Sequence, residues 1–153
     1  PLGMRNKRIH NNQITASSQY DKNHAPYLAR LFAKRRGRFM GAWSAKVNNR
    51  HQWLQIDLGR TMRLEGIATQ GREDANQWVR QFWLYYSMDK VYFSEVRQWF
   101  DNKKVFNGNY DRFVVVINKF RRPLNGRYFR VHPVTWRRRI SMRVEFYGCV
   151  TGI

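Results

Sequence analysis

The chain has 153 residues and a mass of 18.6 kDa, the size of one ordinary domain. Hydrophobic residues make up 42% of it and aromatic residues 16%, which is enough apolar material for a core and excludes an intrinsically disordered segment. The 29 Lys and Arg exceed the 10 Asp and Glu by 19, and this surplus indicates an anionic partner. No apolar run reaches the ~20 residues that a membrane-spanning helix needs.

Short segments of alternating polarity indicate β-structure. Apolar side chains occupy every second position of residues 53–58, and Gly59 follows them, as expected for a half-buried strand. The same period predicts strands at 82–86 and 142–146. No segment of 11 or more residues repeats apolar side chains at helical spacing, so we expect helices to be short or absent.

Two further strands are predicted in the second half of the chain. Residues 112–120 form an apolar run after the turn at 107–109, which predicts a more fully buried strand. Residues 128–131 form another strand that Gly126 opens and Pro133 ends. Together with the alternating segments, these patterns predict an all-β sandwich or barrel.

The basic residues are concentrated in two segments that contain no Asp or Glu. The segments lie between Asp21 and Asp57 and between Asp111 and Glu145, and together they hold 18 of the 29 Lys and Arg. The first contains Lys22, Arg30, Lys34, Arg35, Arg36, Arg38, Lys46 and Arg50, and the second contains Arg112, Lys119, Arg121, Arg122, Arg127, Arg130, Arg137, Arg138, Arg139 and Arg143.

No pattern of a catalytic or metal-binding site is present. None of the four histidines has a carboxylate or cysteine at the spacing of a triad or a zinc motif, and His132 is interpreted as structural. Adjacent Glu73 and Asp74 are typical of a solvated loop, although such oxygens also suit a calcium ion. We therefore expect no enzyme and no cofactor, with calcium left open.

Ten motifs in order along the chain resemble the discoidin domain, also called the coagulation factor 5/8 type C domain. They are PLGM, QITASS, ARL, GAW, WLQIDLG, GIATQGR, QWV, KVFNGNYD, RYFRVHP and RVEFYGC. The resemblance covers essentially all of residues 1–153 and implies a single domain within a larger multidomain protein. It also implies a jelly-roll β-sandwich of about eight main strands, with hairpin loops called spikes projecting from one end.

Membrane-binding members of this family insert apolar spike tips into the bilayer within a collar of basic residues. The resemblance implies spikes near residues 19–28, 34–41 and 72–78, and segment 32–40 (FAKRRGRFM) is longer and more basic than is usual in the family. The candidate loop contacts are Tyr20, Tyr27, Phe39, Met40, Asn76 and Gln77. The candidate anion-binding residues are Arg30, Lys34, Arg35, Arg36, Arg38, Arg137, Arg138, Arg139 and Arg143.

Several of these residues have a second interpretation. Phe39 and Met40 either project at a tip or fold back onto the sandwich, and the run at 137–139 is either an anion site or a solvated loop. The tryptophans in the family motifs are interpreted as core, namely Trp43, Trp53, Trp78 and Trp136.

The single cysteine, Cys149, is either a buried thiol or one half of a disulfide. The family usually joins its two ends by a disulfide whose second cysteine matches Cys149 and whose first lies just before PLG. On that resemblance the partner precedes Pro1, and the parent protein is extracellular, either secreted or at the cell surface.

These observations predict a noncatalytic adhesion module that binds anionic phospholipid membranes of the phosphatidylserine type. The alternative ligands are sulfated or other anionic glycans, as for a heparin-binding or lectin-type domain, or a protein partner in cell adhesion. Nucleic acid is not expected as a biological partner, because the chain has no RNA-recognition, zinc-finger or helix-turn-helix signature.

Overall fold

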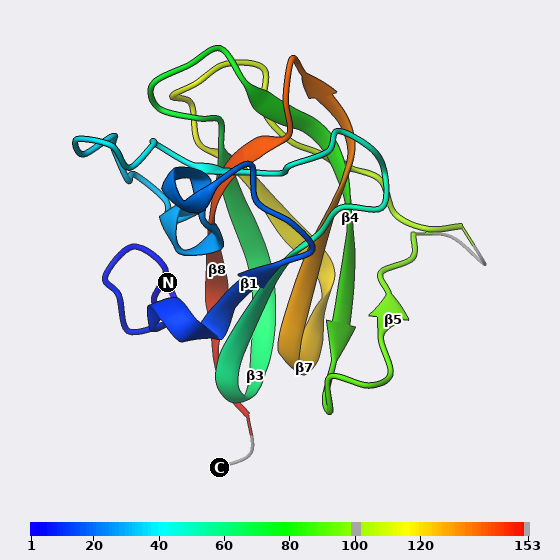
Figure 1. The fold of residues 1–153 in the computed structure, drawn as a ribbon. Helices are drawn as coiled ribbons and strands as arrows, with labels where there is room; N and C mark the ends of the chain where they lie inside the picture. The colour runs from blue at the N-terminus through cyan, green and yellow to red at the C-terminus, as the bar shows by residue number, and fades with distance from the viewer. Residues whose placement is uncertain (99–101, 152–153) are drawn as a thin grey trace.

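Antiparallel strands dominate the computed structural model, which describes residues 1–98 and 102–151 (Figure 1). The strands are β1 (Ile14–Ala16), β2 (Trp43–Ser44), β3 (Leu54–Gln70), β4 (Trp78–Ser87), β5 (Ser94–Glu95), β6 (Phe106–Asn107), β7 (Val116–Arg137) and β8 (Ser141–Val150). Three short 3-10 turns are η1 (Asn11–Gln13), η2 (Lys22–His24) and η3 (Pro26–Leu28). Within the described ranges there is no α-helix, as the sequence predicts, and no helix that could cross a membrane.

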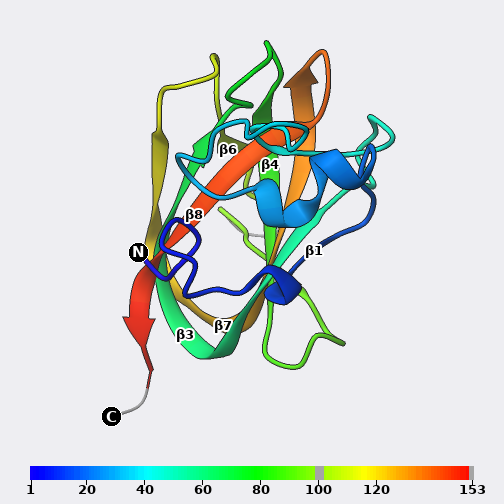
Figure 2. The same ribbon diagram turned by 60° about the vertical axis from the view of Figure 1, so that its left-hand side comes forward.

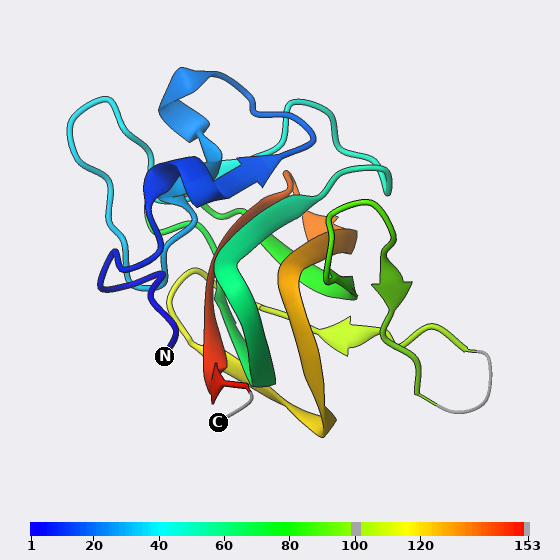
Figure 3. The same cartoon turned by 90° about the horizontal axis from the view of Figure 1, so that it is seen from below.

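Strands β3 and β7 are long and bent, and each contributes to two layers. Residues 54–57 of β3 pair with β1 and with the second half of β7, which pairs in turn with β4. Residues 62–70 of β3 pair with β8 and with the first half of β7. Gly59 lies at the bend with a φ of +81°, a conformation that glycine adopts without steric cost. The result is the predicted β-sandwich, and the view from below shows β8, β3 and β7 in series (Figure 3).

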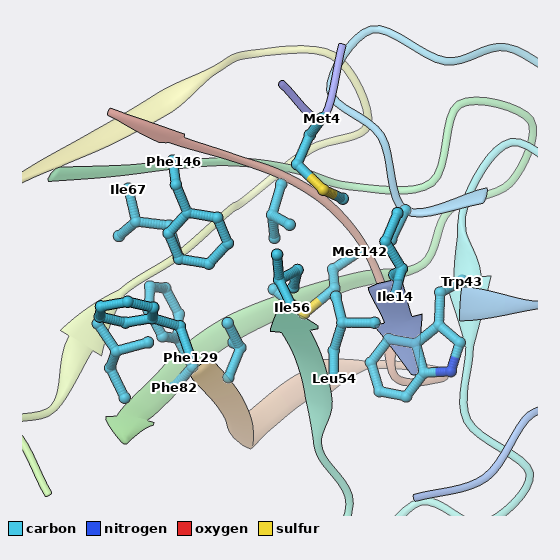
Figure 4. Packing of buried hydrophobic residues seen from close by; sticks show 14 of the residues in the cluster. Met4, Ile14, Trp43, Leu54, Ile56, Ile67, Phe82, Phe129, Met142 and Phe146 are labelled. Atoms are coloured by element: carbon cyan, nitrogen blue, oxygen red, sulfur yellow. The ribbon is translucent and has the colours of Figure 1, made fainter. Parts of the chain in front are cut away.

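The hydrophobic core fills the space between the two layers (Figure 4). Phe82 and Phe129 enter from the β4 and β7 layer, while Ile67 and Phe146 enter from the β3 and β8 layer, and all four are fully buried. The rings of Phe129 and Phe146 lie 5.8 Å apart between centroids, so the two layers are in direct contact.

The four motif tryptophans differ in burial. Trp43 is fully buried, and Trp136 packs partly buried against the core. Trp53 and Trp78 are half-buried, and each lies beneath an arginine guanidinium rather than inside the core. The core interpretation therefore holds for Trp43 and in part for Trp136.

The structure corrects the prediction for residues 112–120. The strand begins only at Val116, and Ile117 is 65% exposed, because this part of β7 pairs with β3 alone among the described strands and forms an edge.

Gly126 and Pro133 do not open and end a strand as predicted. Both lie inside β7, and a register shift opposite Pro133 lets the strand continue to Arg137.

Three loops meet at one end of the sandwich, at the top of Figure 1, and comprise residues 71–77, 108–115 and 138–140. Antiparallel pairing requires this arrangement, since Thr69 near the end of β3 lies opposite Val116 at the start of β7. The segment 19–41 packs alongside, and the first residues of the chain run beside β8 (Figure 2). The fold thus brings the expected spike segments to one end and one flank.

Candidate ligand-binding loops

Backbone and carboxylate hydrogen bonds join the three spikes at their bases. The amide of Met40 in the second spike donates to the carbonyl of Asn23 in the first, at 2.9 Å. The Gly41 amide donates to Asp74 Oδ1 at 3.0 Å, and the Glu73 amide donates to the Gly41 carbonyl at 3.1 Å. The spikes therefore form one connected unit rather than three independent loops.

Gly41 is the point of closest approach between the second and third spikes. A Cβ atom at this position would lie 2.7 Å from the Cβ of Glu73, a separation that van der Waals radii forbid. Nearby, Arg72 forms a two-pronged ion pair with Asp74, with a shortest distance of 2.8 Å. Burial would raise the pKa of Asp74, but hydrogen bonds from Arg72 and the Gly41 amide outweigh it and hold the pKa below its ordinary value.

The tip of the second spike is a tight two-residue turn. Arg36 and Phe39 exchange two backbone hydrogen bonds of 2.9 and 3.0 Å, and Gly37 between them has a φ of +59°. Phe39 is 41% exposed beside this turn, whereas Met40 is half-buried toward the first spike. Of the two side chains, Phe39 is the one that projects.

Four cations surround this tip, and all of them are exposed: Lys34, Arg35, Arg36 and Arg38. The salt bridges within the described part of the chain involve other side chains. Glu73 contacts the spike through one oxygen, which accepts a hydrogen bond from the backbone amide of Arg35 at 3.0 Å. The tip consequently combines one exposed aromatic side chain with four exposed cations on one short segment.

Arg137 at the end of β7 and Arg139 in the 138–140 loop lie against the third and the first spike. The Arg139 guanidinium lies 4.3 Å from the ring centre of Tyr20, which is exposed, and that of Arg137 lies 5.6 Å from the ring of Trp78. Arg138 is exposed. Buried nitrogens of Arg137 and Arg139 have no hydrogen-bond partner among the described residues. The run is thus more than a solvated loop.

Two of the expected anion-binding arginines are buried instead. Arg143 is 2% exposed and donates to the carbonyls of Gly71, Ala33 and Arg112 at 2.7 to 2.8 Å. Burial lowers its pKa to about 10. The position expected for Arg143 at the ligand surface is therefore corrected: its guanidinium holds the loops together from inside.

Arg30 is likewise only 6% exposed and does not reach the spike tips. Its guanidinium donates to the carbonyl of Met4 at 2.8 Å and to the side-chain oxygen of Asn11 at 2.7 Å. Burial lowers the pKa of Arg30, an effect that the charge of Glu145 opposes. This side chain anchors the N-terminal loop to the segment that follows the first spike.

The remaining candidates divide between contact and support. Asn76 is exposed at the turn of the third spike. Gln77 accepts hydrogen bonds from Arg72 and Ser141 at 3.1 and 2.9 Å, so its side chain supports the loop. Tyr27 is half-buried and packs against the core.

The pair Glu73 and Asp74 does not gather further metal ligands. Both oxygens of Asp74 face Arg72, and no group of three or more His, Cys, Asp or Glu side chains occurs among the residues that the structure describes. Calcium binding at this loop therefore has no support beyond the sequence.

Comparison with known proteins identifies the family. The F5/8 type C domain model matches residues 13–146, which is most of the chain. The chain belongs to the F5/8 type C domain family. Members of this family are binding modules and are generally noncatalytic.

This F5/8 type C domain is similar to parts of much longer proteins. It is 40% identical to bovine lactadherin over 158 residues, which cover 97% of the chain and 36% of lactadherin. It is also 40% identical to human coagulation factor VIII over 159 residues, which cover 97% of the chain and 6% of factor VIII. The chain thus spans about a third or less of these relatives.

Solved structures support the same fold. Discoidin II of Dictyostelium discoideum superimposes with a TM-score of 0.81 at 28% identity, over 91% of this chain and 56% of that one. A family 32 carbohydrate-binding module of Clostridium perfringens NanJ, in complex with galactose, gives a TM-score of 0.61 at 15% identity, over 89% and 91% of the two chains. The second likeness concerns the fold alone.

The sequence prediction missed a fourth loop at the spike end of the F5/8 type C domain. Residues 108–115 carry exposed Tyr110 and Phe113, and the Arg112 guanidinium donates to the Glu73 carbonyl. The apolar run from Phe113 onward looked like a strand. The available signal was Asp111. Its carboxylate accepts hydrogen bonds from the amides of Phe113 and Val114 and thereby stabilises a turn.

Proposed function

We propose that this F5/8 type C domain is an extracellular adhesion module that binds anionic phospholipid membranes, of the phosphatidylserine type, through its spikes. The observation that supports this function best is the second spike, where Phe39 projects among four exposed cations on a loop whose base is fixed. An apolar tip within a basic ring matches the layered chemistry of an anionic bilayer, with charge at the surface and hydrocarbon below.

The two contributions have different sizes. Each cation near an anionic leaflet contributes about 1 kcal/mol, so Lys34, Arg35, Arg36 and Arg38 together contribute about 4 kcal/mol. Phe39 is already partly covered, so inserting its ring adds about 1 kcal/mol. Charge therefore dominates the affinity, and binding weakens steeply as salt screens the surface.

The first spike and the 138–140 loop supply a second contact in this proposal. Tyr20 and Asn76 reach the interface, while Arg137, Arg138 and Arg139 meet lipid headgroups. Arg138 is exposed, and Arg139 lies over the exposed Tyr20 ring, which is why this run belongs to the proposed site.

Vesicle flotation tests the proposal. We expect binding to phosphatidylcholine vesicles that contain phosphatidylserine and no binding to phosphatidylcholine alone. Phe39→Ala should weaken binding about 5-fold, and R35E/R38E at least ~30-fold. Matched controls lie at the opposite end of the sandwich, where Tyr92→Ala and R60E/R122E change an exposed aromatic ring and two exposed cations.

The controls should change binding by less than about 2-fold, because salt screens the attraction between the membrane and cations farther away than a Debye length of ~8 Å. Equal binding to both vesicle types would overturn the proposal. So would an R60E/R122E variant that loses as much affinity as R35E/R38E, since that result assigns binding to net charge instead of the spike.

An extracellular location fits the position of Cys149. This thiol is exposed near the end of β8, and the amide of Leu2 donates to the Phe146 carbonyl at 2.8 Å. A cysteine just before Pro1 in a longer chain would thus lie beside Cys149. We include such a disulfide in the proposal, as the family resemblance implies.

A further inference from the structure

A pocket of about 490 Å³ lies on the flank of the molecule, between the N-terminal loop and the second spike, whose Arg36 and Phe39 also line it. In Figures 1 and 2 the N-terminal loop is set back from the loop end of the sandwich. Five cations line the pocket: Arg5, Lys7, Arg30, Lys34 and Arg36. No carboxylate is among the described residues that line it.

The pocket continues into a second hollow. This hollow, of about 460 Å³, shares Lys7, Asn11 and Arg30 with the first and extends to His10 and Asn12. The two together form an elongated basic surface, the flank groove, that follows the N-terminal loop. A groove of this shape suits a chain of charged units better than a single headgroup.

Phe32 gives the flank groove an aromatic wall at a conformational cost. Its φ of +65° lies in the left-handed region, which bulky residues avoid at a cost of about 1–2 kcal/mol. Its ring is 44% exposed, so burial does not repay this cost, and Arg5 lies over the ring at 4.2 Å. The Phe32 amide is fixed by Gln70, whose side-chain oxygen accepts its hydrogen bond at 2.8 Å. Strain held in place this way is typical of functional positions.

Hydrogen bonds from buried charged side chains fix the N-terminal loop that borders the groove. Glu145 is almost fully buried and accepts hydrogen bonds from the amides of Met4 and Arg5 at 2.9 and 3.1 Å. Arg30 completes the floor through its bonds to Met4 and Asn11. The N-terminal loop is therefore preorganised against the sandwich, which lowers the entropic cost of binding.

We infer that the flank groove is a second anion site, on the flank of the second spike and sharing Lys34 and Arg36 with it, that binds a sulfated oligosaccharide. Arg5, Lys7 and Lys34 would meet sulfate groups, and the Phe32 ring would stack on an apolar sugar face. The amides of Asn11 and Asn12 supply the mixed donors and acceptors that sugar hydroxyls need. Arg5 and Lys7 line the groove but take no part in the proposed membrane contact, so a variant at these two residues tests the groove apart from membrane binding.

Calorimetry with a heparin hexasaccharide tests this inference. We expect the sulfated hexasaccharide to bind, and an unsulfated hexasaccharide of the same backbone to bind at least ~10-fold more weakly. R5E/K7E should reduce affinity for the sulfated chain about 10-fold or more and leave vesicle binding within about 2-fold. R60E/R122E is the charge-matched control and should retain the affinity.

Phe32→Gly separates stacking from folding. Glycine accepts the left-handed backbone, so this variant should unfold at the same temperature or higher, yet bind the sulfated hexasaccharide about 5-fold more weakly. A single-stranded oligonucleotide of equal charge is the competing ligand. Competition from it that is equally sensitive to R5E/K7E would assign the groove to nucleic acid and overturn the inference. Equal affinity of R5E/K7E and the parent chain for the hexasaccharide would also overturn it.

Discussion

Arginine side chains in this domain act as internal cross-links as well as surface charges. The Arg143 guanidinium joins three loop carbonyls, and Arg30 joins the N-terminal loop to the body. A hydrogen bond from a charged donor contributes about 1.5–3 kcal/mol, which offsets the desolvation of the buried cation. The net charge of +19 therefore overstates the charge that a ligand meets.

His132 makes the stability of the domain dependent on pH. Burial, with the nearby charges of Arg130 and Lys103, lowers its pKa from 6.5 to about 4. The unfolded chain therefore binds the proton first, and the free energy of unfolding falls by about 3 kcal/mol as the pH drops from about 6.5 to about 4. Above pH 7 this contribution to the pH dependence vanishes, because the imidazole is neutral in both states.

Urea denaturation between pH 7 and pH 4.5 measures this effect. His132→Gln should flatten the pH dependence in that window. The carboxyls of Asp57 and Asp74 have pKa values held below 3.8 and titrate outside it. An unchanged slope in the variant would show that His132 is accessible to protons in the folded state.

The second spike is an element whose position depends on its base more than on its tip. Its hydrogen bonds run to the first spike through Met40 and to the third through Gly41 and Arg35. The tip itself touches little, since a Cβ added at Gly37 would meet no atom within 4 Å. A fixed base with an open tip presents Phe39 without the entropic cost of ordering a free loop.

Gly41→Ala tests the base of the spike. The new Cβ would collide with Glu73, so we expect a loss of about 1–3 kcal/mol in stability and weaker binding to phosphatidylserine vesicles. Gly37→Ala is the control in the same loop and should cost only the ~1 kcal/mol of left-handed strain. Thermal unfolding of both variants measures this difference in stability, and equal melting temperatures would contradict the close packing at Gly41.

The sequence predicts two strands, at 112–120 and 128–131, where the structure has the single strand β7. Gly126 and Pro133 look like strand ends in the sequence, but both lie within one bent strand because β3 bends with it and keeps the pairing. The pairing with β4 shifts register next to Pro133, so the ladder does not require the N–H group that proline lacks. Local sequence cannot report a partner that bends in step.

At the scale of the whole molecule, the cations are divided between the two ends. The second acid-free segment places Arg137, Arg138 and Arg139 at the spikes, while Arg121 and Arg122 lie at the far turn of β7. Arg127, also at the far end, is paired with Asp57 at 2.8 Å. A ligand at the loop end therefore engages only part of the basic surplus.

Cys149 lies on the surface and is expected to react freely in the folded chain. Ellman's reagent should modify it in native buffer about as fast as in denaturant, and mild oxidation should give a disulfide-linked dimer on a nonreducing gel. Cys149→Ser should abolish both. A thiol that reacts only after denaturation would contradict the exposed position on β8.

Sequence patterns were sufficient to predict the all-β class, the family and the concentration of charge in segment 34–38. Those properties are local or additive: alternation has a period of two residues, and charge is a sum over side chains. The motifs also located the spike segments, but they left open whether Phe39 projects or folds back, and its exposure in the structure answers that question.

Which charged side chains are available to a ligand depends on the packing of distant segments and could not be predicted from the sequence. Arg143 and Arg36 look alike in the sequence, yet the first is enclosed by three loops and the second is exposed on a turn. The flank groove also joins residues 5–12 to residues 27–39, which no local pattern connects. Burial and proximity depend on contacts between distant segments, and these arise only when β3 and β7 bend the sheet into a sandwich.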